Sequence, residues 1–184
     1  MQEDNIHLLA NKHIGKTCYI IGSGTSILKL TEKDFEPECP IIAINMTIPV
    51  IEKLKLDNPI YSMQKDTDKR WVDEGYTSLP IKAILLVNVQ AGVNIFPEYL
   101  QRYGFISSNL GVNGKHDFSA IVALKIAEKF GCVKFKLMGF DSYWGDIHNF
   151  YDRRRRYASE RYGRQMTRML RRIQDDNLNV EWIK

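Results

Sequence analysis

The sequence predicts a single α/β domain of Rossmann-like type over residues 1–184, with a mostly parallel sheet and helices on both faces. Short apolar runs alternate with helical patterns along the chain, which is typical of parallel strands joined by helical crossovers. One of the first apolar runs leads directly into a glycine and serine loop, as at the ligand-binding turn of many α/β proteins. With 44% hydrophobic content, 184 residues suffice to bury one core of ordinary size.

The apolar runs give the expected order of elements. We expect strands over residues 17–21, 41–45, 60–63, 81–88, 133–138 and 180–183. Helical spacing predicts a short amphipathic helix over 3–11, a clear helix over 118–130 capped by Gly131, and a basic helix over 158–174. A further helical face would carry Ile51, Leu54 and Leu56.

The loop after the first strand is the first candidate site, and its residues are Gly22, Ser23, Gly24, Thr25 and Ser26. Glycines let the backbone turn sharply, and a following helix would direct its free N–H groups toward an anion such as a phosphate. The loop lacks both the third glycine of the dinucleotide fingerprint and the Gly-Lys-Ser/Thr ending of a P-loop. A plain strand-to-helix turn is therefore the alternative.

Polar residues also follow the other predicted strands. They are Asn45, Gln64, Asn88 and Asp141. Because ligands of open parallel sheets bind at the carboxyl ends of the strands, these residues join the loop as candidate binding residues. Asn and Asp are also common as plain turn residues, which is the alternative for each one taken alone.

The charge is distributed unevenly. Residues 151–172 contain nine arginines against two acidic residues, a local charge of +7 in a chain of net charge +4. A solvated helix face and an anion-binding surface both account for such a segment, since arginine grips phosphate with a planar fork.

Other composition features bound the class of protein. No apolar run approaches the length of a membrane span and the first residues do not resemble a signal peptide, so we expect a cytoplasmic protein. Cys18, Cys39 and Cys132 show neither disulfide nor metal-ligand spacing, which favours buried thiols.

Four segments together carry a family resemblance, and they read Ile-Ile-Gly22-Ser-Gly-Thr-Ser26, Ala-Ile-Asn45, Ser119-Ala-Ile-Val-Ala-Leu and Gly139-Phe-Asp141-Ser-Tyr143. In this order the chain resembles the bacterial sialyltransferases that use CMP-sialic acid to decorate lipooligosaccharide. It is also similar to related Rossmann-like proteins that include a 6-hydroxymethylpterin pyrophosphokinase.

The resemblance implies a glycosyltransferase that uses a nucleotide-activated sugar, with a CMP-sugar preferred, by inverting displacement onto an acceptor hydroxyl. It implies that the glycine loop approaches the nucleotide phosphate, that Asn45 faces the ribose, phosphate or sugar, and that Ser119 lies near the donor sugar. Asp141 would hold the nucleotide, and Tyr143 would hydrogen-bond the leaving phosphate. The donor is the substrate and no further cofactor is required. A homo-oligomer is expected.

Several groups are available for the chemistry itself. His148 lies seven residues beyond Asp141 and is the candidate base, because an ordinary histidine titrates near neutral pH. Groups that could stabilise the departing phosphate lie in the basic segment, and they include Tyr157, Tyr162, Arg153 and Arg156. In the family the catalytic histidine comes later in the chain, where this sequence has arginine and tyrosine.

Two other functions stay open. A magnesium- and ATP-dependent pyrophosphokinase would use Asp66 and Asp68 as metal ligands, although a solvated Asp-rich turn before a helix, with Asp68 as its cap, is the favoured explanation of these two residues. A nucleic-acid-binding or DNA-modifying protein would use the arginines and tyrosines of residues 151–172 to contact phosphates and stack on bases.

Overall fold

The fold is organised around a parallel sheet. The computed structural model describes residues 6–64, 84–88, 105–108, 119–141 and 160–183. Within them seven strands form one sheet in the order β5-β4-β3-β2-β1-β6-β7, and every pairing is parallel. The strands are β1 (Thr17–Ile21), β2 (Ile41–Ile44), β3 (Ile60–Gln64), β4 (Ile84–Asn88), β5 (Phe105–Ser108), β6 (Lys134–Met138) and β7 (Val180–Ile183).

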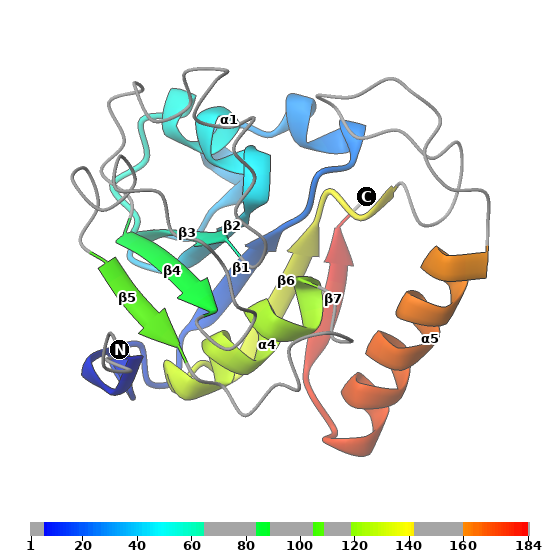
Figure 1. Ribbon diagram of the computed structural model, residues 1–184. Coiled ribbons are helices and arrows are strands. Elements are labelled where there is room, and N and C mark those ends of the chain that lie inside the picture. The colour runs from blue at the N-terminus through cyan, green and yellow to red at the C-terminus, as the bar shows by residue number, and fades with distance from the viewer. Residues whose placement is uncertain (1–5, 65–83, 89–104, 109–118, 142–159, 184) are drawn as a thin grey trace.

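Helical segments cover both faces of this sheet (Figure 1). The α-helices are α1 (Ile48–Lys53), α4 (Ser119–Lys129) and α5 (Glu160–Asp175). Short 3₁₀ helices are η1 (Ile6–Leu9), η2 (Thr25–Lys29), η3 (Glu32–Asp34) and η4 (Asn45–Thr47). The Rossmann-like α/β class that the alternating pattern predicts is confirmed.

Alternate residues of each central strand point into two separate hydrophobic cores. On one face Ile20 of β1 packs with α4 and the buried side of α5, while on the other Ile21 packs with η2 and α1. Strands buried on both faces have no polar side to show, which is why β1 and β2 read as continuous apolar runs. Cys18, Cys39 and Cys132 are buried free thiols, as the sequence predicts.

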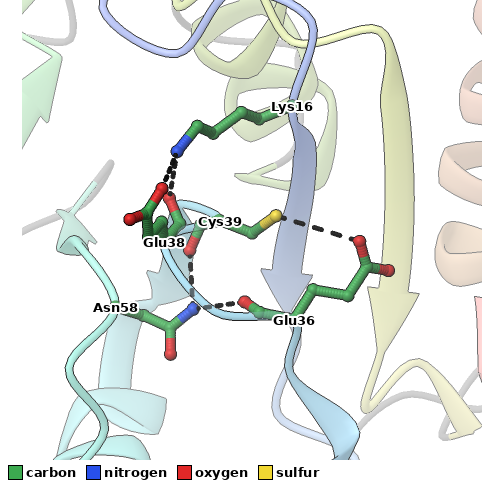
Figure 2. A network of polar contacts seen from close by, with 5 residues as sticks. All are labelled: Lys16, Glu36, Glu38, Cys39 and Asn58. Carbon is green, nitrogen blue, oxygen red and sulfur yellow. Dashed lines mark hydrogen bonds and ion pairs between the residues drawn. The ribbon is translucent and has the colours of Figure 1, made fainter.

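A polar network fastens the turn before β2 to its neighbours (Figure 2). The Asn58 amide donates to the carbonyl oxygens of Glu36 at 2.8 Å and Cys39 at 2.9 Å. Lys16 pairs with Glu38 at 2.9 Å, which joins the start of β1 to the same turn. This network lies at the amino ends of the strands, on the side opposite to the loops that follow them.

Three local predictions differ from the structure. The turn after the glycine loop forms the single 3₁₀ helix η2, because Leu30 is extended and Thr31 starts a new turn through its hydrogen bonds to Asp34. In residues 6–11, part of the predicted amphipathic helix over 3–11, the helical element is the short η1. Strand β5 was not predicted, because its four residues contain only two apolar ones followed by two serines.

The order of the strands fixes where a ligand would bind. From β1 the chain proceeds outward through β2, β3, β4 and β5, and it then returns to the other side of β1 as β6. Strand order therefore reverses between β1 and β6, and the loops that follow these two strands mark the position where doubly wound sheets typically bind their ligands. Among the described residues no helix is long and apolar enough to span a bilayer.

Candidate functional site

The loops after β1 and β6 meet at the carboxyl edge of the sheet. Ile21 and Met138, the last residues of the two strands, are partners in the register, so each is followed by a glycine at the same level. The Gly22 N–H donates to the Met138 carbonyl at 2.7 Å, and the Gly24 N–H donates to the Gly139 carbonyl at 2.7 Å. The two loops thus continue the pairing of β1 and β6 beyond the strands.

Three glycines make this close approach of the loops possible. A Cβ atom on Gly22 would lie 2.7 Å from the Gly139 carbonyl oxygen, and one on Gly24 would overlap the Asp141 carboxylate. Gly139 has a φ of +72° and would direct a Cβ into Ile27. The pairing of two protein loops is therefore sufficient to account for the glycines that the sequence suggests for a phosphate.

The Asp141 carboxylate is the polar centre of the site. Its Oδ1 accepts a hydrogen bond from the Ser26 hydroxyl at 2.5 Å. Its Oδ2 accepts from the Thr25 hydroxyl at 3.1 Å and from the Ser26 backbone N–H at 3.2 Å. The hydroxyl donors that the sequence offers to a ligand anion therefore bind an anion of the protein itself.

These hydrogen bonds also determine the charge of the group. Partial burial by itself would raise the pKa of Asp141, but the hydrogen bonds from Ser26 and Thr25 outweigh it and hold the pKa below its ordinary value. Asp141 is therefore ionised at neutral pH. In the part of the chain that the structure describes, no lysine or arginine forms an ion pair with this carboxylate.

Asn45 lies at the end of the neighbouring strand β2, with a left-handed backbone conformation at a φ of +54°. Asparagine tolerates this conformation better than most residues, which accounts for its place at the turn from β2 into η4. The hydroxyl of Thr47, in the same turn, lies 3.0 Å from the Ile44 carbonyl and 3.4 Å from the Ile21 carbonyl. Thr47 thereby ties the ends of β1 and β2 together.

The other predicted binding residues are distributed along the same edge and over α5. Gln64 and Asn88 end β3 and β4, and Tyr162 lies within α5. Ser119 begins α4, whose opposite end is at the amino edge of the sheet, where the Asn11 N–H donates to the Lys129 carbonyl at 2.9 Å. Because α4 ends at the amino edge, its first residue, Ser119, lies toward the carboxyl edge of the sheet. The remaining predictions lie outside the described residues, and they are Asp66, Asp68, Tyr143, His148, Arg153, Arg156 and Tyr157.

The sequence includes Gly139 in the motif of the family resemblance but assigns it no role in the site, and it does not point to Thr47 at all. Gly139 supplies the carbonyl that Gly24 binds, and its place directly after a buried strand and two residues before Asp141 is the signal that could have identified it. Thr47 offers no such signal, since a threonine in a turn is common. For metal binding, the described residues contain no group of three or more histidine, cysteine or acidic side chains in ligand geometry.

Helix α5 presents two different faces. Met166 and Met169 are buried in the core beside α4, and Arg172 is bound to Glu128 of α4 at 2.8 Å. The exposed positions include Arg164, Arg168 and Arg171, which follow the i, i+4, i+7 spacing of one helix face. The basic segment therefore folds in its carboxyl-terminal part as an amphipathic helix with arginines on its outer side.

Fold and site together define the chain as an α/β protein of Rossmann-like fold, with two paired loops that hold an ionised acid at its switch point. The sequence matches no known family model and no curated protein. The class of the protein therefore rests on the sheet topology and on the geometry of the two loops.

Proposed function

We propose that the carboxyl edge of the sheet, at the paired β1 and β6 loops, binds a nucleotide-activated sugar, with a CMP-sugar as the leading donor, and that the protein transfers the sugar to an acceptor hydroxyl. The observation that carries the proposal is the contact of Ser26 with Asp141 at the point where strand order reverses. Asn45 begins η4 and Ser119 begins α4, and both elements start toward the carboxyl edge of the sheet. The choice of donor rests on the sialyltransferase resemblance of these segments.

In the proposed reaction the acceptor oxygen bonds to the anomeric carbon while the bond from that carbon to the nucleotide phosphate breaks. The acceptor proton passes to a base, and the negative charge leaves with the nucleotide. Groups that donate hydrogen bonds to the departing phosphate lower the barrier. His148 as the base, with Tyr143 and Tyr157 beside the phosphate, stays a prediction from the sequence.

A thermal-shift screen tests the proposal. The purified protein is heated with CMP, CDP, UDP, GDP, ATP with and without magnesium, and a short DNA. A ligand at about 100 times its dissociation constant stabilises the folded state by about 2.7 kcal/mol, which raises the melting temperature by roughly 5–10 °C for a chain of this size. We expect selective stabilisation by a cytidine or uridine nucleotide.

The variant Asp141→Ala should lose this ligand-dependent shift, whereas Asp57→Ala, which changes an exposed acid before β3, should retain it. Stabilisation only by magnesium-ATP would instead favour the pyrophosphokinase. Absence of any nucleotide response would refute the proposal. A positive result would then justify an assay for sugar transfer with the donor so identified.

The outer face of α5 favours nucleic-acid binding as a second candidate function. Arg164, Arg168 and Arg171 are exposed on one side of a helix whose other side is fixed in the core. Each phosphate contact should contribute about 0.9 to the slope of the logarithm of affinity for duplex DNA against the logarithm of salt concentration. Replacing Arg168 and Arg171 by glutamine should lower that slope by about 2. An unchanged slope would exclude this face.

A further inference from the structure

The Asp141 carboxylate still offers one acceptor position to a ligand. A carboxylate has about four lone-pair sites on its two oxygens, and Ser26 and Thr25 supply the donors described above. Asp141 and Ser26 are half-buried and Thr25 is exposed, so the group is held in place without being enclosed. A carboxylate fixed in this way is prepared to accept a hydrogen bond from outside the protein.

The same geometry disfavours a phosphate at the glycine loop. The hydroxyls of Thr25 and Ser26 and the Ser26 N–H already bind an anion, and the Gly24 N–H binds the Gly139 carbonyl. A phosphate placed there would compete for these donors and would lie beside an ionised carboxylate with no paired lysine or arginine among the described residues. Two close anions repel each other strongly in a partly buried site.

A comparison with the dinucleotide fingerprint suggests what the carboxylate binds instead. In that fingerprint an acid follows the second strand and accepts a hydrogen bond from a ribose hydroxyl. In this chain Asn45 follows the second strand, and the acid comes from β6 on the other side of β1. Asp141 therefore brings an acidic acceptor to the β1 loop from the side opposite to β2.

We propose that Asp141 binds the uncharged nucleoside half of the donor, through a ribose hydroxyl or a base amino group, and that the glycine loop supports this carboxylate instead of cradling a phosphate. The inference rests on the proposed function, because it concerns the same site at the β1 and β6 loops. It assigns an orientation to the ligand, with the nucleoside at the Asp141 carboxylate and the phosphate directed away from the glycine loop.

Titration calorimetry on the wild-type protein tests the orientation without any mutation. The probes are cytidine, uridine, adenosine and guanosine, their 5′-monophosphates, and their 2′,3′-dideoxy forms. For the base that binds, we expect removal of the 5′-phosphate to weaken binding less than about 3-fold. Loss of the hydrogen bond to Asp141 should weaken it at least about 10-fold, since bonds to charged groups are the stronger ones. The dideoxy forms test the ribose, and cytidine against uridine tests an amino group.

A variant pair adds a second readout. Asp141→Asn retains the shape of the side chain but removes its charge, and Asp57→Asn serves as the matched exposed control. In Asp141→Asn, we expect removal of the ribose hydroxyls or of the amino group to weaken binding less than about 3-fold. In Asp57→Asn, the same removal should weaken binding as much as it does in the wild type. If Asp141→Asn does not fold, the wild-type series decides alone.

The outcomes separate this inference from the proposed function. One outcome would overturn the orientation and leave the proposed function standing. In it, nucleotides bind more than about 10-fold tighter than their nucleosides, and removing the hydroxyl or amino groups does not change the affinity. If no nucleoside and no nucleotide binds, both fail. Tighter nucleotide binding by Asp141→Asn than by the wild type, at an unchanged nucleoside affinity, would also overturn the orientation, since it would place the phosphate beside the carboxylate.

Discussion

Replacing Gly139 by alanine should destabilise the protein more than the same change at Gly15. Both glycines have a left-handed backbone, with φ of +72° and +75°. At Gly15 a Cβ atom meets nothing within 4 Å, whereas at Gly139 it would overlap Ile27 and the Gly22 carbonyl. Gly15→Ala therefore measures the backbone penalty alone, and the difference between the two variants measures the close approach of the β1 and β6 loops.

The magnitudes follow from the two contributions. The left-handed conformation costs an alanine about 1–2 kcal/mol, and forcing an extra carbon into a packed site costs about 1–3 kcal/mol more. We expect Gly15→Ala to lower the free energy of unfolding by about 1–2 kcal/mol and Gly139→Ala by about 2–5 kcal/mol.

Urea denaturation followed by circular dichroism measures both values. With a slope of about 2 kcal/mol per molar, the two midpoints should differ by roughly 0.5–1.5 M. Equal losses of stability, within about 0.5 kcal/mol, would mean that the loops tolerate a Cβ at Gly139. The explanation of the glycines by loop pairing would then be wrong.

Three further predictions concern buried and hydrogen-bonded side chains. Burial lowers the pKa of His13 from 6.5 to about 4, so the unfolded chain takes up its proton first as the pH falls. The free energy of unfolding should drop by up to about 3 kcal/mol between pH 6.5 and 4, and His13→Gln should remove this dependence in urea titrations. Asn58→Ala, which loses both of its hydrogen bonds to the turn before β2, should lower stability by about 1–3 kcal/mol in thermal unfolding. Ser26→Ala, which loses the hydroxyl bound to Asp141, should lower the free energy of unfolding by about 1.5–3 kcal/mol at pH 7. Because Asp141 has a lowered pKa, that loss should shrink as the pH falls below 3.8, and a loss independent of pH would contradict the role given to the carboxylate.

Much of the sheet could be predicted because burial on both faces leaves a simple signal. The predicted bounds of Thr17–Ile21 and Val180–Ile183 agree with the structure, and those of β2, β3 and β6 each differ by one residue. Strand β5 shows the limit of this signal. Phe105–Ser108 has too few apolar residues to be distinguished from a loop, and its strand character comes from pairing with β4.

The candidate site could be predicted only in part. Gly22, Gly24 and Asp141 are identifiable from the sequence because each stands within three residues of the end of an apolar run. Their contact was not foreseen, because 115 residues separate Ser26 from Asp141 and only the insertion of β1 between β2 and β6 brings them together. The strand order arises from tertiary packing, and no local propensity in the sequence specifies it.

The glycine loop illustrates how one pattern follows from two physical causes. A Gly-x-Gly turn lets a phosphate approach the backbone, and it equally lets a neighbouring loop approach it. In this protein Gly22, Gly24 and Gly139 are explained by the second cause, since a Cβ at each would meet the opposing loop. The hydroxyls beside them bind the Asp141 carboxylate and hold its pKa below the ordinary value, so that it stays ionised at neutral pH despite its partial burial. When an acid follows the strand adjacent to such a loop, at the same level in the register, the loop is better interpreted as the support of that acid than as a phosphate site.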